Sequence, residues 1–130
     1  MSAIRVTCGV ILKDGKVLAA QRSEKMKLPL KWEFPGGKIQ IGETEEECIK
    51  REIKEELNIC ITIKYRLHSV HHAYDDFQIE LIPFIVEFEN GSLRLHEHRQ
   101  IAWLTNNELR TLDWASADIP ILEEFLSLSP

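Results

Sequence analysis

Three glutamates stand at helical spacing near the middle of the chain. Glu52, Glu55 and Glu56 occupy positions i, i+3 and i+4, so a helix would bring their carboxylates onto one patch of its surface. Like charges at this spacing repel one another, so a purely structural role would be costly. A hard divalent cation such as Mg²⁺ prefers several oxygen ligands close together. The spacing therefore favours a metal site, with a solvated acidic helix face as the alternative.

The stretch from Thr44 to Leu57 has the signals that place these glutamates on a helix. Thr44 and Glu47 form a capping box, and the first turn is acidic. Asn58 follows at the position where helices often end in a left-handed residue. Apolar residues recur at spacings of four on another side of the same helix, and these are Ile49, Ile53 and Leu57. We expect that side to be buried.

Two features before this helix connect it to a loop. Gly36-Gly37 provides a backbone that can approach a metal or a phosphate closely. Glu43 can hold the loop by accepting hydrogen bonds from Arg51 or from backbone N–H groups. On a merely solvated face, Arg51 would instead pair with Glu55 at i+4. Loop and helix together indicate one site.

The fixed residues of this region reproduce a known motif. Their spacing is that of the Nudix box, and they are Gly37, Glu43, Arg51, Glu52, Ile53, Glu55, Glu56, Asn58 and Ile59. The chain therefore resembles the Nudix hydrolases. Asn58 is the one departure, since the family usually has Gly there, and Asn is the next best residue at positive φ. The segments 33–38 and 117–122 resemble the MutT branch, small enzymes that convert nucleoside triphosphates to monophosphates and pyrophosphate.

The resemblance implies roles for the acidic residues. Mg²⁺, with Mn²⁺ as an alternative, would bind the substrate phosphates through the Gly36 carbonyl and the carboxylates of Glu52, Glu55, Glu56 and Glu97. Glu97 is alternatively a solvated loop residue. The expected catalytic residues are Glu52 as general base, with Glu97 as the alternative base, Glu55, and Arg51, which orients the carboxylates. Zinc on the histidines of 71–72 and 96–98 lacks further ligands at a recognisable spacing.

The expected substrate-binding residues lie mostly outside the acidic cluster. They are Arg22, Phe34, Gly37, Lys38, Phe77 and Asp118. Arg22 resembles the family's phosphate-contacting arginine, and Lys38 is a second candidate; each is otherwise a surface charge. Phe34 and Phe77 either wall in the base or belong to the core. Asp118 stands where MutT-like enzymes hydrogen-bond the base, and its alternative role is a helix cap.

The choice of base stays open between oxidised dGTP and (d)CTP. In our alignment the oxidised-guanine enzyme has an arginine near position 77, where this chain has Phe77. The segments 96–98 and 117–120 resemble relatives that prefer cytidine nucleotides. Rival functions are the hydrolysis of ADP-ribose or dinucleoside polyphosphates, and a nucleotide sensor without catalysis. Such sensors commonly lose box carboxylates, and this chain keeps them all.

Bulk properties narrow the remaining possibilities. A chain of 130 residues predicts one domain spanning residues 1–130, either monomeric or homodimeric. The net charge of −5 disfavours sequence-independent binding to DNA or RNA. The longest apolar run, 81–86, is too short for a membrane span, and no signal peptide is apparent, so we expect a cytoplasmic protein. Three cysteines without a C-x-x-C pair indicate reduced, mostly buried thiols.

The remaining sequence predicts mainly strands. We expect a hairpin from strands 4–12 and 17–21 around Asp14-Gly15, an irregular segment from 23 to 37, and extended chain from Cys60. A turn is expected at 71–76, a strand at 77–88, a hairpin turn at Asn90-Gly91 and a strand at 101–104. Helices are expected after Thr105 and over 119–128. The class is α+β, and the resemblance implies the Nudix fold, an α/β/α sandwich with a mixed β-sheet.

Overall fold

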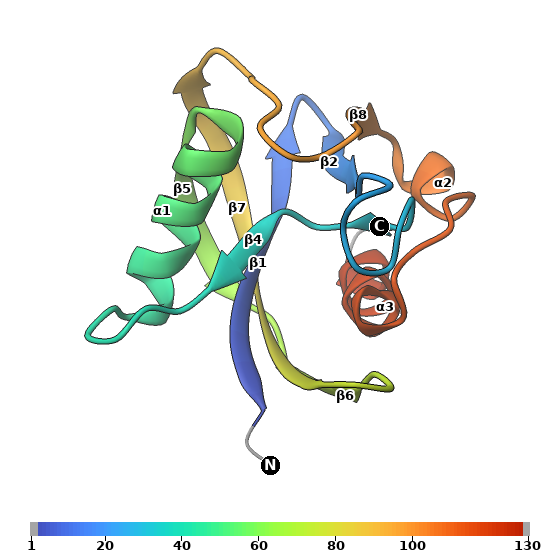
Figure 1. Ribbon diagram of the computed structural model, residues 1–130. Coiled ribbons are helices and arrows are strands. Elements are labelled where there is room, and N and C mark those ends of the chain that lie inside the picture. Colours follow the sequence, from blue (N-terminus) through green and yellow to red (C-terminus); the bar gives the residue numbers. More distant parts are fainter. Residues whose placement is uncertain (1–2, 129–130) are drawn as a thin grey trace.

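Helices cover both faces of a mixed sheet in the computed structural model, which describes residues 3–128 (Figure 1). Within those residues the sheet has eight strands, with the main order β3-β2-β1-β7-β5. β4 pairs with β1, β6 with β7, and β8 with β2. The central pair β1 and β7 is parallel, and the other pairs are antiparallel. The expected mixed sheet between helices is confirmed.

The elements follow in this order: β1 (Ile4–Lys13), β2 (Lys16–Gln21), β3 (Trp32–Glu33), β4 (Gly36–Lys38), α1 (Glu45–Leu57), β5 (Ile59–Arg66), β6 (Val70–Ala73), β7 (Gln78–Gly91), β8 (Gln100–Leu104), α2 (Asn106–Leu109), the 3-10 turn η1 (Ser116–Asp118) and α3 (Ile119–Leu128). In Figure 1, α1 lies on one face of the sheet and α3 on the other. No helix within residues 3–128 is long and apolar enough to cross a membrane.

The sheet is buried on both faces because its central strands carry apolar residues on both sides. In β1, Val10 belongs to the core beneath α3, whereas its neighbour Ile11 belongs to the core beneath α1. Ile85 and Val86 of β7 divide in the same way. Successive side chains of a strand point to opposite faces, so an unbroken apolar run supplies two cores at once. This arrangement holds α1 and α3 on opposite sides of the sheet.

Helix α1 forms as its sequence predicts. The Thr44 hydroxyl accepts from the Glu47 N–H at 3.0 Å, and the Glu47 carboxylate accepts from the Thr44 N–H at 2.9 Å. Asn58 ends the helix in the left-handed conformation at φ 59°. The apolar side is fully buried, as expected, through Ile49, Ile53 and Leu57. The clustered glutamates lie outside that buried side, with Glu55 exposed and Glu52 and Glu56 partly buried.

Three expectations of irregular chain are wrong. Residues 71–73, expected in a turn, belong to β6 and pair with β7. Asn90-Gly91, expected as a hairpin turn, continues β7, because β5 supplies its partners Ile59 and Cys60. Parts of the expected loop, Trp32–Glu33 and Gly36–Lys38, form β3 and β4. For Gly36–Lys38 and Asn90-Gly91 a strand distant in the sequence satisfies the backbone hydrogen bonds, which local turn signals do not reveal. For residues 71–73 the partner is the next strand, and the turn is confined to residues 74–77.

The end of α1 provides a test of the departure at Asn58. A side chain without a special preference for the left-handed region loses about 1 kcal/mol there. We expect Asn58→Ala to lower the free energy of unfolding by about this amount. Asn58→Gly should stay close to the wild type, since relief of the backbone offsets the lost hydrogen bond from the Asn58 amide to the Ser92 carbonyl. Urea unfolding of the three proteins measures the difference, and equal stability of the two variants would contradict it.

Candidate active site

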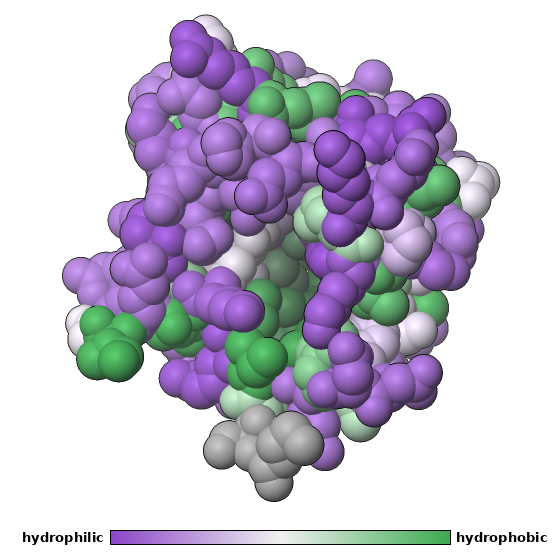
Figure 2. Space-filling model, viewed as in Figure 1, coloured by the Kyte–Doolittle hydropathy of each residue, from purple (hydrophilic) through white to green (hydrophobic). Residues whose placement is uncertain are grey.

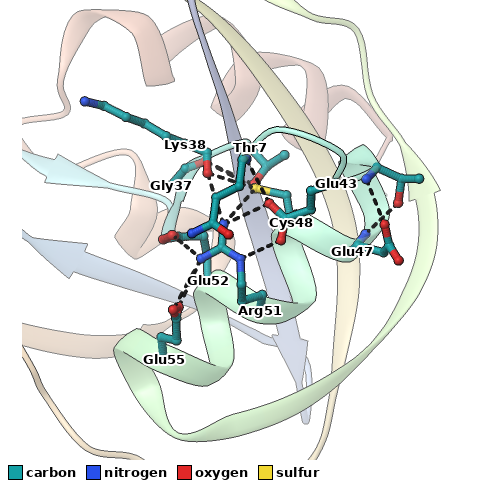
Figure 3. Close-up of polar contacts among 11 residues, drawn as sticks. Thr7, Gly37, Lys38, Glu43, Glu47, Cys48, Arg51, Glu52 and Glu55 are labelled. Atoms are coloured by element: carbon teal, nitrogen blue, oxygen red, sulfur yellow. Dashed lines mark hydrogen bonds and ion pairs between the residues drawn. The ribbon is translucent and has the colours of Figure 1, made fainter.

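The Arg51 guanidinium holds the loop before α1 against the helix (Figure 3). It binds both carboxylate oxygens of Glu43, at 2.5 and 2.9 Å, and donates to the Lys38 carbonyl at 3.1 Å. The same guanidinium contacts Glu52 at 2.8 Å and Glu55 at 3.0 Å. It lowers the pKa of Glu43 to about 2. Arg51 therefore orients two of the three clustered glutamates, and Glu43 acts as its anchor.

Gly36 and Gly37 lie where no side chain fits. A Cβ atom on Gly36 would stand 2.0 Å from the Thr7 carbonyl oxygen of the paired strand β1. A Cβ atom on Gly37 would stand 2.0 Å from a carboxylate oxygen of Glu52. The first glycine permits strand pairing, and the second leaves room for the Glu52 carboxylate beside the backbone of β4. Their close approach therefore involves the protein's own groups.

Glu56 differs from the other two glutamates because one of its oxygens is buried without a partner. Among residues 3–128, its Oε2 is the only buried side-chain oxygen or nitrogen that lacks a hydrogen bond. Burial, and then repulsion from Glu52, Glu33 and Glu97, raises the pKa of Glu56 to about 9. Such a group needs either a proton or a cation nearby. The hard oxygen donors around it fit a divalent cation such as Mg²⁺.

The carboxylates do not form a ready-made cage. Within residues 3–128, no three His, Cys, Asp or Glu side chains converge as metal ligands would. Arg51 accounts for this, because it holds Glu52 and Glu55 at its own nitrogens. Glu55 is also the most exposed of the three, with 55% of its side-chain surface accessible. A cation at this site would therefore compete with Arg51 for oxygens.

A cavity of about 450 Å³ opens beside Glu56, and Figure 2 shows the hollow in the face of the molecule. It brings together many of the residues predicted for the site, which are Arg22, Phe34, Gly36, Gly37, Lys38, Glu56, Phe77, Glu97 and Asp118. Glu52 and Glu55 lie outside its wall. All six residues predicted to bind substrate thus border one cavity, although their roles there stay predictions.

A chain of polar contacts crosses the charged side of this cavity. Glu33 accepts from Arg22 at 2.7 Å, and its other oxygen lies 2.7 Å from His98 Nε2. His98 is buried, and its Nδ1 lies 4.0 Å from the orphan oxygen of Glu56. Glu33 and His98 are not among the predicted site residues. They are 65 residues apart, so only their shared cavity identifies them.

Asp118 lies in the wall of the cavity and is 5% exposed. Its Oδ2 accepts a hydrogen bond from the Phe34 N–H at 2.9 Å. Phe34 does not belong to α3, so this hydrogen bond does not cap the terminal helix. Burial and the nearby Glu33 carboxylate raise the pKa of Asp118 well above the usual range. The Phe34 ring packs 4.6 Å from Trp114, which makes Phe34 both core and cavity wall.

Comparisons with known proteins agree with this geometry. The family model described as NUDIX domain matches residues 7–124. The chain is 35% identical over 128 residues to the "CTP pyrophosphohydrolase" of Escherichia coli (strain K12), covering 98% of this chain and 95% of that protein. It is 26% identical over 129 residues to the "8-oxo-dGTP diphosphatase" of the same strain, covering 98% and 100%.

Solved structures agree as well. The solution structure of the E. coli ORF135 protein has a TM-score of 0.86 and 36% identity, covering 98% of this chain and 91% of that one. The solution structure of the mismatch repair protein MutT from Methicillin Resistant Staphylococcus aureus 252 has a TM-score of 0.79 and 40% identity, covering 98% of both chains.

The raised pKa of Glu56 predicts the pH dependence of stability without metal. A carboxyl group whose pKa rises from 4.5 unfolded to about 9 folded stabilises the fold at low pH. That contribution declines by up to about 1.4 kcal/mol per pH unit between the two values. We expect Glu56→Gln to be more stable than the wild type at pH 8 in a chelator, and the two to converge towards pH 4.5.

Thermal unfolding from pH 5 to 9 measures this difference. Glu46→Gln, an exposed position on the same helix, is the control and should follow the wild type. Adding Mg²⁺ should raise the melting temperature of the wild type more than that of Glu56→Gln. Parallel pH profiles of Glu56→Gln and the wild type would show that folding does not raise the pKa of the Glu56 carboxyl.

Proposed function

Because the chain belongs to the NUDIX domain family and is a Nudix hydrolase, we propose that it hydrolyses (deoxy)nucleoside triphosphates to the monophosphate and pyrophosphate. The observation that carries the proposal is the cavity itself. Its lining combines the charged Glu56, Glu97 and Arg22 with apolar side chains and the buried Asp118. A nucleotide likewise combines charged phosphates with a flat base.

The charged side is suited to phosphates only with a cation present. Nudix hydrolases generally use divalent metal ions, and we propose Mg²⁺, with Mn²⁺ as the alternative. Its ligands would be Glu52, Glu55, Glu56, Glu97 and the Gly36 carbonyl. When bound, the ion would neutralise charge on the phosphates.

The protein's own side chains would activate the attacking water and bind the phosphates. Arg51 fixes one oxygen of Glu52, and the other oxygen can accept a proton from the attacking water, so Glu52 is the proposed general base. Arg22 and Lys38 would bind phosphate oxygens. Water would add at the β-phosphorus while the bond from that phosphorus to the bridging oxygen of the monophosphate breaks. Positioning and electrostatics supply most of the rate in such reactions.

The proposed role is to clear the nucleotide pool of an unwanted triphosphate in the cytoplasm, which would protect DNA from miscoding nucleotides. The names of the relatives suggest both candidate substrates, since one acts on CTP and others on 8-oxo-dGTP. We therefore propose oxidised dGTP and (d)CTP as the substrate class. That residues 1–130 act as one domain, and as a monomer or homodimer, stays a prediction.

Pyrophosphate release from a panel of triphosphates with Mg²⁺ tests the activity. We expect release by the wild type, and a fall in kcat of at least about 100-fold for Glu52→Gln, because the amide cannot accept the proton. The melting temperature should change little, and Glu46→Gln should remain active. Release from no nucleotide would refute the enzyme and favour a sensor, whereas near-normal turnover of Glu52→Gln would refute its role as base.

Asp118 provides a separate test of base recognition. We expect Asp118→Ala to change the ratio of kcat/KM between dCTP and 8-oxo-dGTP, because the side chain would contact the base and not the phosphates. Asp118→Asn should retain more of the wild-type ratio, since an amide also offers one acceptor and a donor. An equal loss on every triphosphate would instead make Asp118 a purely structural residue.

A further inference from the structure

Tyr74 borders the cavity next to Asp118. Its hydroxyl oxygen accepts from the Ala117 N–H at 3.0 Å, and Ala117 directly precedes Asp118 in the chain. A tight turn fixes the residue, because the Tyr74 N–H donates to the Phe77 carbonyl at 2.8 Å. The ring lies 5.0 Å from that of Phe77, which borders the same cavity. The hydroxyl group is therefore held in place beside the buried carboxyl.

The Tyr74 hydroxyl keeps a proton to donate. A phenol has one proton and can also accept, and the Ala117 N–H uses only an acceptor position. Within residues 3–128 no group accepts a hydrogen bond from this hydroxyl. Burial raises the pKa of Tyr74, so the group remains a phenol at neutral pH. The cavity wall thus contains an O–H donor without a protein partner.

Asp118 complements this donor. Its Oδ2 accepts from the Phe34 N–H, while its other oxygen has no hydrogen-bond partner in the described part of the chain. Burial favours the protonated carboxyl, which offers both a donor and an acceptor. Tyr74 adds a second donor beside it. Together they match a base edge with an acceptor and an N–H, flanked by a further acceptor.

We propose that Tyr74 is a specificity-determining residue whose hydroxyl donates to a carbonyl oxygen of the substrate base, beside the edge that pairs with Asp118. The inference rests on the proposed triphosphate hydrolysis. In cytosine the carboxyl would pair with N3 and the N4 amine, and the O2 carbonyl lies next to them. In 8-oxoguanine it would pair with O6 and the N7–H, and the O8 carbonyl lies next to them.

Adenine and unmodified guanine, the bases of the competing triphosphates, lack the carbonyl oxygen that Tyr74 would bind. Adenine offers an edge like that of cytosine, with N1 and the N6 amine, but has C2–H where cytosine has O2. Guanine has C8–H where its oxidised form has O8. An unpaired buried donor costs more than a missing contact alone, so the Tyr74 hydroxyl would discriminate against both bases.

Tyr74→Phe removes the hydroxyl and keeps the ring. We expect kcat/KM to fall roughly 3- to 10-fold, mainly through KM, for whichever of dCTP and 8-oxo-dGTP the wild type hydrolyses. The values for dATP and dGTP should rise, because Phe removes the buried donor that these two bases leave unpaired. Tyr65→Phe is the matched control, because Tyr65 is the only other tyrosine and is half exposed on β5, outside the cavity. It should leave all four values unchanged.

A modified substrate tests the same contact in the unaltered protein. Replacing O2 of dCTP with sulfur, a weaker acceptor, should raise its KM for the wild type but not for Tyr74→Phe. Equal losses on all four triphosphates would overturn the proposal and leave Tyr74 a structural partner of Ala117. An unchanged profile would overturn it too. If the wild type released pyrophosphate from none of them, the proposed function itself would fail.

Discussion

The contacts of Arg51 are the interaction on which the acidic site depends. One guanidinium joins Glu43, the Lys38 carbonyl, Glu52 and Glu55, so strand β4, the following loop and helix α1 meet at a single cation. Without it, clustered carboxylates would repel one another and the loop would lose its anchor. Arg51 satisfies Glu52 and Glu55 but does not reach Glu56. The unpartnered oxygen of Glu56 is the consequence, and it marks where the protein still lacks positive charge.

The sheet determines which elements lie across the cavity from Glu56. Because β1 and β7 are parallel and buried on both faces, α1 and the segment of η1 and α3 must lie on opposite sides. The cavity extends past the sheet near β4, from Glu56 of α1 to Asp118 of η1. Two carboxyls thus stand in one cavity with pKa values raised by the same causes, burial and neighbouring carboxylates. They differ in their partners, because Asp118 accepts a hydrogen bond from a backbone N–H, which opposes the rise in its pKa, whereas the buried oxygen of Glu56 has no hydrogen-bond partner.

The parts of this arrangement that could be predicted from the sequence are local. The capping box at Thr44, the left-handed Asn58 and the buried side of α1 each depend on residues within a few positions of one another. The motif of the box likewise lies within one loop and one helix. Two of the errors concern contacts between distant segments, as for Gly91, whose partner Ile59 belongs to a strand far earlier in the chain, and the third misplaces the end of strand β6. Turn signals show that a segment is able to turn, but whether it turns or continues a strand depends on the partner strand.

The same distinction explains the two sides of the cavity. Resemblance in the box indicates the bond to be broken, because the carboxylates of α1 are neighbours in the sequence. The wall near Asp118 combines η1, the chain directly after β3 and the turn after β6, and its polar groups meet only in the folded chain. His98 and Tyr74 therefore do not stand out in the sequence, since His98 follows the proposed metal ligand Glu97 and Tyr74 lies in an expected turn. The proposed base recognition depends on such long-range contacts, so relatives that share the box would be able to differ in substrate.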